Sequence, residues 1–310
     1  MRNNHNICLI GAGYMAEEYL KVLSDKKLKC FGIHSRTKSK INYLKEKYNI
    51  KKIFKNIREI NNSEEIDSII IAVNEISTFK ILNKLNLKKF KILCEKPVGV
   101  NYDESQKILK LIKKNRSSLF VSMNRRYFNS TIKAKNYVKN KTGKRFIYIN
   151  DQQIQNRKKA VVNKQMMYGN SVHLIDYINM FGRGSLKKII KIKKNEFKKM
   201  SETISKIFLS SGDEILYTCN WNSAGAWSVN IIQSNQRCEL KPLENLMHEE
   251  LVNGKRIRKN YNVIGYDKKF KPGLYLLVTE FLKMLSGKRY HLINFRDYFK
   301  TVEMIKKIYG

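Results

Sequence analysis

The order of apolar and polar positions changes character after roughly the first 120 residues. Before that point, short apolar runs alternate with segments of helical period, and Ile69–Val73 has no polar interruption. Uninterrupted apolar strands are typical of parallel sheets that are covered on both faces. Expected strands are Ile7–Ile10, Lys29–His34, Ser68–Val73, Lys91–Cys94 and Leu119–Ser122, and expected helices are Ala16–Ser24, Ser39–Tyr48, Ser77–Leu85 and Tyr102–Asn115.

After Ser122 the pattern favours consecutive strands. Ser211-Gly212-Asp213 separates two of them as a hairpin turn would, and successive hairpins imply a largely antiparallel sheet with one open face. Expected strands are Arg145–Asp151, Leu186–Lys193, Ile204–Leu209, Glu214–Trp221, Trp227–Gln233 and Arg237–Lys241, and expected helices are Ser130–Lys139, Ser171–Met180, Leu274–Ser286 and Phe295–Tyr309.

These elements predict an α/β protein with two domains. Residues 1–122 should form a Rossmann-type, doubly wound parallel sheet. Residues 123–310 should form an α+β domain with a mainly antiparallel open sheet, and the last helix is expected to pack back on the first domain.

Charge is the most unusual feature of the composition, because 62 Lys and Arg face 26 Asp and Glu and the net charge is +36. Such a balance suggests nucleic acid as a partner. Lysine is nevertheless spread along the whole chain, and no zinc-finger spacing, RNA-binding aromatic motif or helix-turn-helix signal accompanies it. We therefore expect no specific nucleic-acid partner, and a field that favours anionic ligands such as dinucleotides and phosphorylated sugars.

The remaining composition indicates a cytoplasmic protein. No apolar run approaches the ~20 residues of a membrane span. Met1–His5 leads directly into the first strand, which leaves no room for a signal peptide. The five cysteines are scattered and form no C-x-x-C pair, as expected for free thiols in a reducing compartment. No spacing of metal ligands stands out, so we expect no metal. Because no apolar run is long enough to span a membrane, we also expect no membrane partner.

The chemistry begins at the first strand, where Gly11-Ala12-Gly13-Tyr14-Met15-Ala16 follows Ile10. In a G-x-G-x-x-A motif between a strand and a helix, the first glycine permits the turn and the second lets the backbone approach a pyrophosphate. The helix N-terminus then offers N–H groups to the phosphates. The alternative is a glycine turn in another kind of α/β protein. Expected cofactor contacts here are Gly11, Gly13, Tyr14 and Met15, with Val73 and Asn74 at the end of the third expected strand.

The end of the second expected strand bears on the choice of cofactor. An NAD site usually has an acidic residue there for the ribose 2′-hydroxyl, and this chain has none. Ser35, Arg36 and Lys38 could instead bind a 2′-phosphate through charge-assisted hydrogen bonds. We predict NADP, with NAD as the alternative; the competing interpretation is a basic turn in a basic protein.

A second informative segment, Glu95-Lys96-Pro97, ends a buried strand at the sheet edge where ligands bind. Lys96 could hydrogen-bond a substrate hydroxyl and stabilise developing alkoxide charge, while Glu95 orients it and Pro97 fixes the turn as a cis bond. Both Glu95 and Lys96 would also adjoin the cofactor. The alternative is a solvated lysine after a strand.

This E-K-P, together with the glycine motif, resembles the glucose–fructose oxidoreductase/inositol dehydrogenase family, Gfo/Idh/MocA. The resemblance extends to Asn124-Arg125-Arg126-Tyr127 and to a helical motif, D-x-G-x-H-x-x-D, in which His173 and Asp176 match. Gly169 stands in the first acidic position and Ser171 in that of the glycine. The resemblance implies Lys96 and His173 as catalytic residues. It implies substrate contacts from Lys96, Asn124, Arg125, Arg126, Tyr168, Asn170, His173 and Asp176.

The resemblance implies an NAD(P)-dependent oxidoreductase that transfers a hydride between nicotinamide and a secondary alcohol or ketone of a sugar, sugar nucleotide or cyclitol. Surface-polysaccharide sugar biosynthesis is an expected setting. A homodimer or homotetramer formed through the open sheet is the expected assembly. Because Gly169 replaces an acid, the alternative is a catalytically inactive dinucleotide-binding protein of the same fold with a regulatory or binding role.

Overall fold

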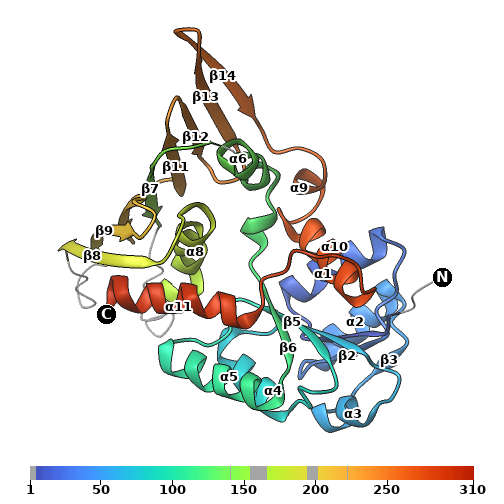
Figure 1. Ribbon diagram of the computed structural model, residues 1–310. Helices are drawn as coiled ribbons and strands as arrows, with labels where there is room; N and C mark the ends of the chain where they lie inside the picture. Colours follow the sequence, from blue (N-terminus) through green and yellow to red (C-terminus); the bar gives the residue numbers. More distant parts are fainter. Residues whose placement is uncertain (1–4, 140, 154–165, 194–201, 222) are drawn as a thin grey trace. The chain divides into compact units, whose positions relative to one another are not determined.

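The computed structural model describes residues 5–139, 141–153, 166–193, 202–221 and 223–310 (Figure 1). The chain divides into two compact units, which interleave along the sequence. The first unit contains Met1–Asn124 and Lys269–Phe299, and the second contains Arg125–Lys268 and Lys300–Gly310.

A six-stranded parallel sheet forms the centre of the first unit. Its strands are β1 (Ile7–Ile10), β2 (Gly32–His34), β3 (Lys52–Ile53), β4 (Ser68–Ile71), β5 (Lys91–Glu95) and β6 (Ser118–Ser122). Their order is β3-β2-β1-β4-β5-β6, and every neighbouring pair is parallel. All residues of β1 and β4 are buried, as the uninterrupted apolar pattern predicts. This is the doubly wound Rossmann order, in which ligands bind where the strand order reverses, beside β1.

The described residues of the first unit contain six helices that lie wholly within it, and three of the six begin at an asparagine cap. They are α1 (Tyr14–Asp25), α2 (Lys38–Tyr48), α3 (Ile57–Asn62), α4 (Glu75–Lys84), α5 (Tyr102–Asn115) and α10 (Leu274–Leu285). Asn56, Asn74 and Asn101 each accept a hydrogen bond from a backbone N–H of the helix that follows. Helix α1 instead follows Gly13, which has no side chain to offer.

The second unit contains an eight-stranded sheet, mostly antiparallel as expected. Its strands are β7 (Arg145–Gln152), β8 (Leu186–Lys193), β9 (Glu202–Leu209), β10 (Glu214–Asn220), β11 (Ser228–Gln233), β12 (Gln236–Leu240), β13 (Leu246–Val252) and β14 (Lys255–Tyr261). The order is β14-β13-β12-β11-β7-β10-β9-β8, with β7 and β10 parallel. Buried and partly exposed positions alternate along β9 and β10, so one face of these strands is packed and the other more open.

Helical segments complete the second unit. They are a 3₁₀ turn (Asn124–Tyr127), α6 (Asn129–Lys139), a π-helical turn (Met167–Ser171), α8 (Val172–Phe181), α9 (Tyr266–Lys269) and α11 (Phe295–Tyr309). The 3₁₀ turn and α9 each cross the boundary between the units by one residue, and α11 begins in the first unit and ends in the second.

Several elements of the fold have weak sequence patterns and were not predicted. β3 and α3 are short, and the hairpin β13–β14 was not predicted. β14 has six exposed residues in succession, so no apolar alternation marks it as a strand. The expected strand from Lys29 begins only at Gly32.

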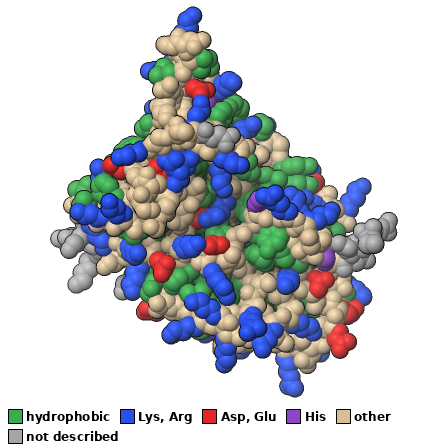
Figure 2. All heavy atoms as spheres, viewed as in Figure 1, with side chains coloured by type: hydrophobic (Ala, Val, Ile, Leu, Met, Phe, Trp, Pro, Cys, Tyr) green, Lys and Arg blue, Asp and Glu red, His purple; other side chains and the backbone are tan. Residues whose placement is uncertain are grey.

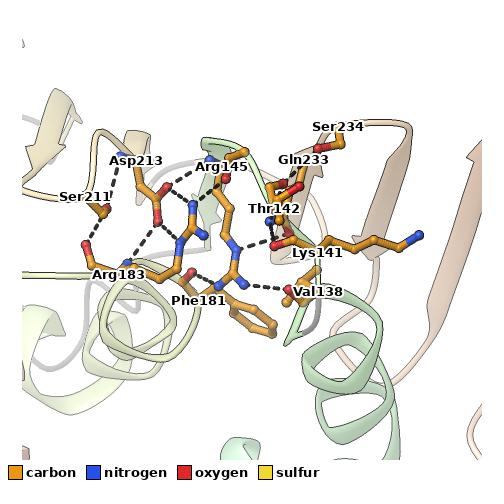
Figure 3. A network of polar contacts seen from close by, with 11 residues as sticks. Val138, Lys141, Thr142, Arg145, Phe181, Arg183, Ser211, Asp213, Gln233 and Ser234 are labelled. Carbon is orange, nitrogen blue, oxygen red and sulfur yellow. Dashed lines mark hydrogen bonds and ion pairs between the residues drawn. The ribbon is translucent and has the colours of Figure 1, made fainter.

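A buried polar network joins β7 to its surroundings in the second unit (Figure 3). The Arg145 guanidinium, which is 7% exposed, donates to the carbonyl oxygens of Val138 (2.6 Å) and Phe181 (2.7 Å) and to the Gln233 side chain (3.2 Å). These carbonyls end α6 and α8, so one cation satisfies the last turns of two helices. Asp213 accepts from the Arg145 N–H and from the Arg183 guanidinium.

The face of the molecule drawn in Figure 2 carries its positive charge without an obvious focus. On this face, Lys and Arg side chains are scattered among polar and apolar ones.

The cysteines are all free and buried: Cys8, Cys30, Cys94, Cys219 and Cys238. Within the described residues, no helix combines the length and apolar character needed to span a membrane.

Candidate functional site

A cavity of about 660 Å³ opens at the carboxyl ends of β1, β2 and β4 in the first unit. Its volume lies in the range typical of small-molecule and cofactor sites. The described residues that line it are Ile10, Gly11, Ala12, Gly13, Tyr14, Met15, His34, Ser35, Arg36, Thr37, Lys40, Ile57, Ala72, Val73, Asn74, Ser77, Lys80, Ile81 and Lys84. Eight of the expected cofactor contacts meet here: Gly11, Gly13, Tyr14, Met15, Ser35, Arg36, Val73 and Asn74.

The two glycines of the motif are needed for different reasons. Gly11 has φ +126, and a Cβ there would lie 2.0 Å from the Ala72 carbonyl oxygen, so the fold itself requires a glycine. Gly13 has an ordinary φ of −89, and a Cβ built on it meets no protein atom within 4 Å. The space beside Gly13 therefore belongs to the cavity, which is what close approach of a pyrophosphate demands.

Helix α1 starts at this glycine and offers its first N–H groups without a side-chain cap. Gly13 is its N-cap, and Ala16 is fully buried, so the helix packs closely behind the turn. Helix α1 has 12 residues, and its uncapped N-terminus beside the open cavity suits a phosphate group.

The charged side chains at this cavity are basic. Arg36, Lys40, Lys80 and Lys84 line it, and no acidic residue occurs among the described lining residues. Lys38 was expected here, but Lys40 lines the cavity instead. Helix α2 begins at Lys38, and residues two apart on a helix point in different directions.

Glu95 and Lys96 lie at the end of β5, outside the described lining of the cavity. The Lys96–Pro97 peptide bond is cis, as the sequence suggested. A Glu95 carboxyl oxygen accepts hydrogen bonds from the Tyr19 hydroxyl (2.6 Å) and the Ser122 hydroxyl (2.8 Å). Burial raises the pKa of Glu95, and these hydrogen bonds together with the cations Lys96 and Lys271 oppose that rise.

In the second unit, an aromatic side chain lies between two of the expected substrate contacts. The Arg125 guanidinium stacks over the Trp227 ring at 4.7 Å, and the His173 ring centroid is 6.4 Å from that of Trp227. His173 is on α8 and is 1% exposed. Gly169 lies in the preceding π-helical turn, and a Cβ there would meet no atom of the described residues within 4 Å.

Two other expected substrate contacts bind each other. The Arg126 guanidinium donates to both oxygens of Asp176, at 2.6 and 2.7 Å, and Asp176 is 1% exposed. Thr301 also donates to Asp176. This pair fixes α8 to the 3₁₀ turn that carries Arg125 and Arg126.

The remaining expected contacts differ in their surroundings. Asn124 is buried and donates from its side chain to the Pro272 carbonyl oxygen at 3.0 Å. Tyr168 is 8% exposed. Asn170 is exposed and donates to Gln153 at 3.3 Å. Of these three, Asn170 is therefore the one whose side chain is open to solvent.

The comparisons with known proteins identify this architecture. Residues 5–123 match the model of an oxidoreductase family with an NAD-binding Rossmann fold, Gfo/Idh/MocA. Over these residues, the chain is similar to the Gfo/Idh/MocA oxidoreductase family.

One curated relative over part of the chain is a cyclitol dehydrogenase. Myo-inositol 2-dehydrogenase of Thermotoga maritima is 25% identical over 130 residues, which are 42% of this chain and 38% of that protein. The chain thus matches about two-fifths of the length of this curated relative.

Solved structures match over nearly the whole chain and show the fold. Levoglucosan dehydrogenase in complex with NADH superposes with a TM-score of 0.81, 14% identity and coverage of 99% of this chain and 96% of that one. UDP-N-acetylglucosamine 3-dehydrogenase from Acidithiobacillus ferrooxidans gives 0.79, with 10% identity and coverage of 98% and 96%.

The cavity of the first unit and the Trp227 cluster of the second unit each contain residues that the sequence did not predict. Thr37, Lys40, Lys80 and Lys84 line the cavity, and Trp227 contacts the ring of His173 and the guanidinium of Arg125. Lys40 follows the basic turn and could have been found by extending it one helical turn. Lys80, Lys84 and Trp227 carry no local signal, because only the fold brings them to these places.

Proposed function

We propose that this protein is an NADP-dependent oxidoreductase that acts on a secondary alcohol or ketone of a sugar, sugar nucleotide or cyclitol. The observation that carries the proposal is the open space at Gly13, beside an uncapped helix, in a cavity whose charged lining is basic. The residues present fit a dinucleotide, since the pyrophosphate needs both the missing Cβ and the free N–H groups.

NADP supplies the hydride chemistry when it is bound. Arg36 and Lys40, with the Ser35 hydroxyl, would hold its 2′-phosphate, because these residues follow β2 where an NAD site has an acid. NAD is the alternative cofactor.

Lys96 would manage the proton of the reacting hydroxyl. It follows the carboxyl end of β5, and the neighbouring strand β4 ends at the cofactor cavity. A cation there can hydrogen-bond the hydroxyl and stabilise the charge that develops as the proton leaves. Glu95, fixed by Tyr19 and Ser122, would hold a compensating negative charge behind it.

His173 would share this proton transfer. What supports its role is the match of α8 to the family motif and the contact of its ring with Trp227. Substrate contacts are proposed for Lys96, Asn124, Arg125, Arg126, Tyr168, Asn170, His173 and Asp176. Arg126 and Asp176 would act there as a preformed pair, given their mutual hydrogen bonds.

The test is turnover with NADPH or NADP across a panel of sugars, sugar nucleotides and cyclitols. Lys96→Met and His173→Ala should each reduce turnover by about 10²–10⁴-fold, as for loss of a general acid–base group. NADPH affinity should hardly change in either variant. The double variant should lose less than the product of the two, because residues that act as a unit are non-additive. Full activity in Lys96→Met would exclude the proposed role.

A second candidate is a dinucleotide-binding protein of this fold without turnover, and Gly169 favours it. Gly169→Asp separates the two candidates, because it restores the acid and a Cβ at this position would meet no atom of the described residues within 4 Å. If the unmutated protein binds NADPH but reduces or oxidises nothing in the panel, and Gly169→Asp gains activity, the second candidate is correct for the natural chain.

We also propose a cytoplasmic location, a role in surface-polysaccharide sugar biosynthesis, and a homodimer or homotetramer formed through the more open face of the eight-stranded sheet. Half-exposed or exposed apolar side chains on its strands, such as Phe146 and Ile232, support the last point. Light scattering coupled to gel filtration would measure the assembly, and Phe146→Glu should dissociate it.

A further inference from the structure

Lys271 lies beside the glycine turn, although it is 257 residues away from Tyr14 in the sequence. Its Nζ is 5.4 Å from the centroid of the Tyr14 ring. Tyr14 follows Gly13, lines the cavity and is 66% exposed. The same lysine is close enough to the Glu95 carboxyl to lower its pKa, although burial prevails and the pKa is raised overall. A cation therefore stands between the start of α1 and the end of β5.

The chain around Lys271 is fixed by contacts within the first unit. Asn124 donates to the Pro272 carbonyl oxygen, and the Leu274 N–H donates to the Lys271 carbonyl oxygen, both at 3.0 Å. On one side Lys269 pairs with Asp25 at the end of α1. On the other, Lys26 lies over the Tyr275 ring at 3.6 Å. The position of Lys271 is thus determined by the packing of this segment against α1.

We propose that Lys271 is a cofactor-binding residue that contacts the pyrophosphate from outside the glycine motif. The helix N-terminus approaches the phosphates with N–H groups, and a lysine ammonium adds a full positive charge that those groups lack. The Lys271 ammonium lies over the ring of Tyr14, and Tyr14 itself lines the cavity. Arg36 and Lys40, by contrast, follow β2 on the adenosine side.

The two basic groups should therefore be distinguishable by ligand. The pyrophosphate is common to NADPH, NADH and ADP-ribose, whereas only NADPH carries the 2′-phosphate. This inference rests on the cofactor use proposed above, but its test reads binding alone and needs no substrate.

The experiment measures the affinity of Lys271→Met for NADPH and NADH by fluorescence titration, and for ADP-ribose by competition. Methionine keeps an apolar stem on Tyr14, and Lys271→Arg keeps the charge. We expect Lys271→Met to weaken all three ligands by about the same factor, tenfold or more. Adenosine 2′-phosphate, which lacks the pyrophosphate, should keep its affinity. Lys271→Arg should retain most of the binding, and the exposed Lys268→Met is the matched control.

Unchanged affinity in Lys271→Met, or a loss confined to NADPH, would overturn the inference. The first outcome makes Lys271 a solvated lysine that packs on Tyr14, and the second moves it to the 2′-phosphate. Both leave the proposed oxidoreductase activity standing. Conversely, tight binding that depends on Lys271 without turnover of any substrate would sustain this inference and reject the activity.

Discussion

The cofactor cavity of the first unit and the polar network of the second use basic side chains in opposite ways. Arg36 and Lys40 are exposed at the cavity, where the described lining residues include no acid. Arg145 is buried, and its guanidinium donates to three acceptors of the protein itself (Figure 3). The chain has a net charge of +36, so the presence of an arginine alone does not indicate a ligand site. An arginine indicates a ligand where the protein itself does not provide hydrogen-bond acceptors for its guanidinium.

The largest expected effect tests the structural half of this comparison. Arg145→Met should lower the free energy of unfolding by about 3–5 kcal/mol, because it leaves the Val138 and Phe181 carbonyls buried without their donor. Denaturant titration measures the loss, and Lys144→Met, at an exposed neighbour, is the control. Cofactor affinity of the folded variant should not change. A cost below 1 kcal/mol would mean that the carbonyls find other partners.

Gly13→Val tests the functional half. A Cβ at Gly13 meets no protein atom within 4 Å and φ is ordinary, so the free energy of unfolding should stay within about 1 kcal/mol. NADPH affinity should fall by about a hundredfold or more, or about 3 kcal/mol, because the side chain occupies the place of the pyrophosphate. Gly11→Val is the contrast, since it should destabilise the fold itself. Unaltered titration of Gly13→Val with NADPH would refute the cofactor site.

Arg36→Ala tests whether this arginine binds the 2′-phosphate, which NADPH carries and NADH lacks. The variant should lose about 1.5–3 kcal/mol of NADPH binding, the usual contribution of a charge-assisted hydrogen bond, while NADH binding stays within twofold. The ratio of the two dissociation constants is the measurement. Equal losses for both cofactors would make Arg36 part of a general basic surface, and the preference for NADP would have to be abandoned.

A buried carboxyl of the second unit gives the smallest and most pH-dependent effect. Asp151 is fully buried and accepts from Tyr217 at 2.7 Å and Gln153 at 2.9 Å. Burial raises the pKa of Asp151 to about 6, against the opposing effect of its hydrogen bonds. Asp213 shows the reverse: burial alone would raise its pKa, but the Arg183 hydrogen bonds bring the pKa below its usual value.

The signs of the two pH dependences follow from these directions. Because the folded protein holds the Asp151 proton more tightly than the unfolded chain, this contribution to stability falls as pH rises from about 4 to about 6. Asp151→Asn should remove this pH dependence. The change in stability from pH 5 to pH 7 should therefore be more favourable in the variant than in the unmutated protein, by about 1 kcal/mol. Ionised Asp213 stabilises the folded protein at pH values above the pKa that Asp213 has in the unfolded chain. This contribution to stability is lost as the pH falls through the lower pKa of the folded protein. Chemical denaturation at both pH values is the measurement, and parallel curves for the two proteins would contradict it.

The elements predicted most accurately from the sequence are strands that are buried on both faces of the sheet. β1, β4 and β5 were predicted to within two residues at each end, because an uninterrupted apolar run has few other meanings in an α/β chain. β14 was missed because its exposed residues carry no alternation, and the π-helical turn before α8 because its residues resemble any helix start.

The candidate site divides in the same way. Gly11, Gly13 and Arg36 could be selected because motif and strand end lie next to each other in the chain. Lys271, Lys80 and Trp227 could not, since their neighbours come from distant segments. Lys38 was chosen in place of Lys40 because the helix start sets which of the two points inward, and that start was placed one residue late.

The sequence alone determined that a strand, a glycine turn and a helix begin this chain, since a backbone that approaches a phosphate excludes a Cβ and the motif is local. It also determined the parallel sheet, because strands that are buried on both faces are apolar at nearly every position. Only the tertiary structure decided which cations serve the fold and which remain for a ligand. Arg145 and Arg36 look alike in the sequence, and whether a guanidinium meets carbonyls or an open cavity depends on segments far away along the chain.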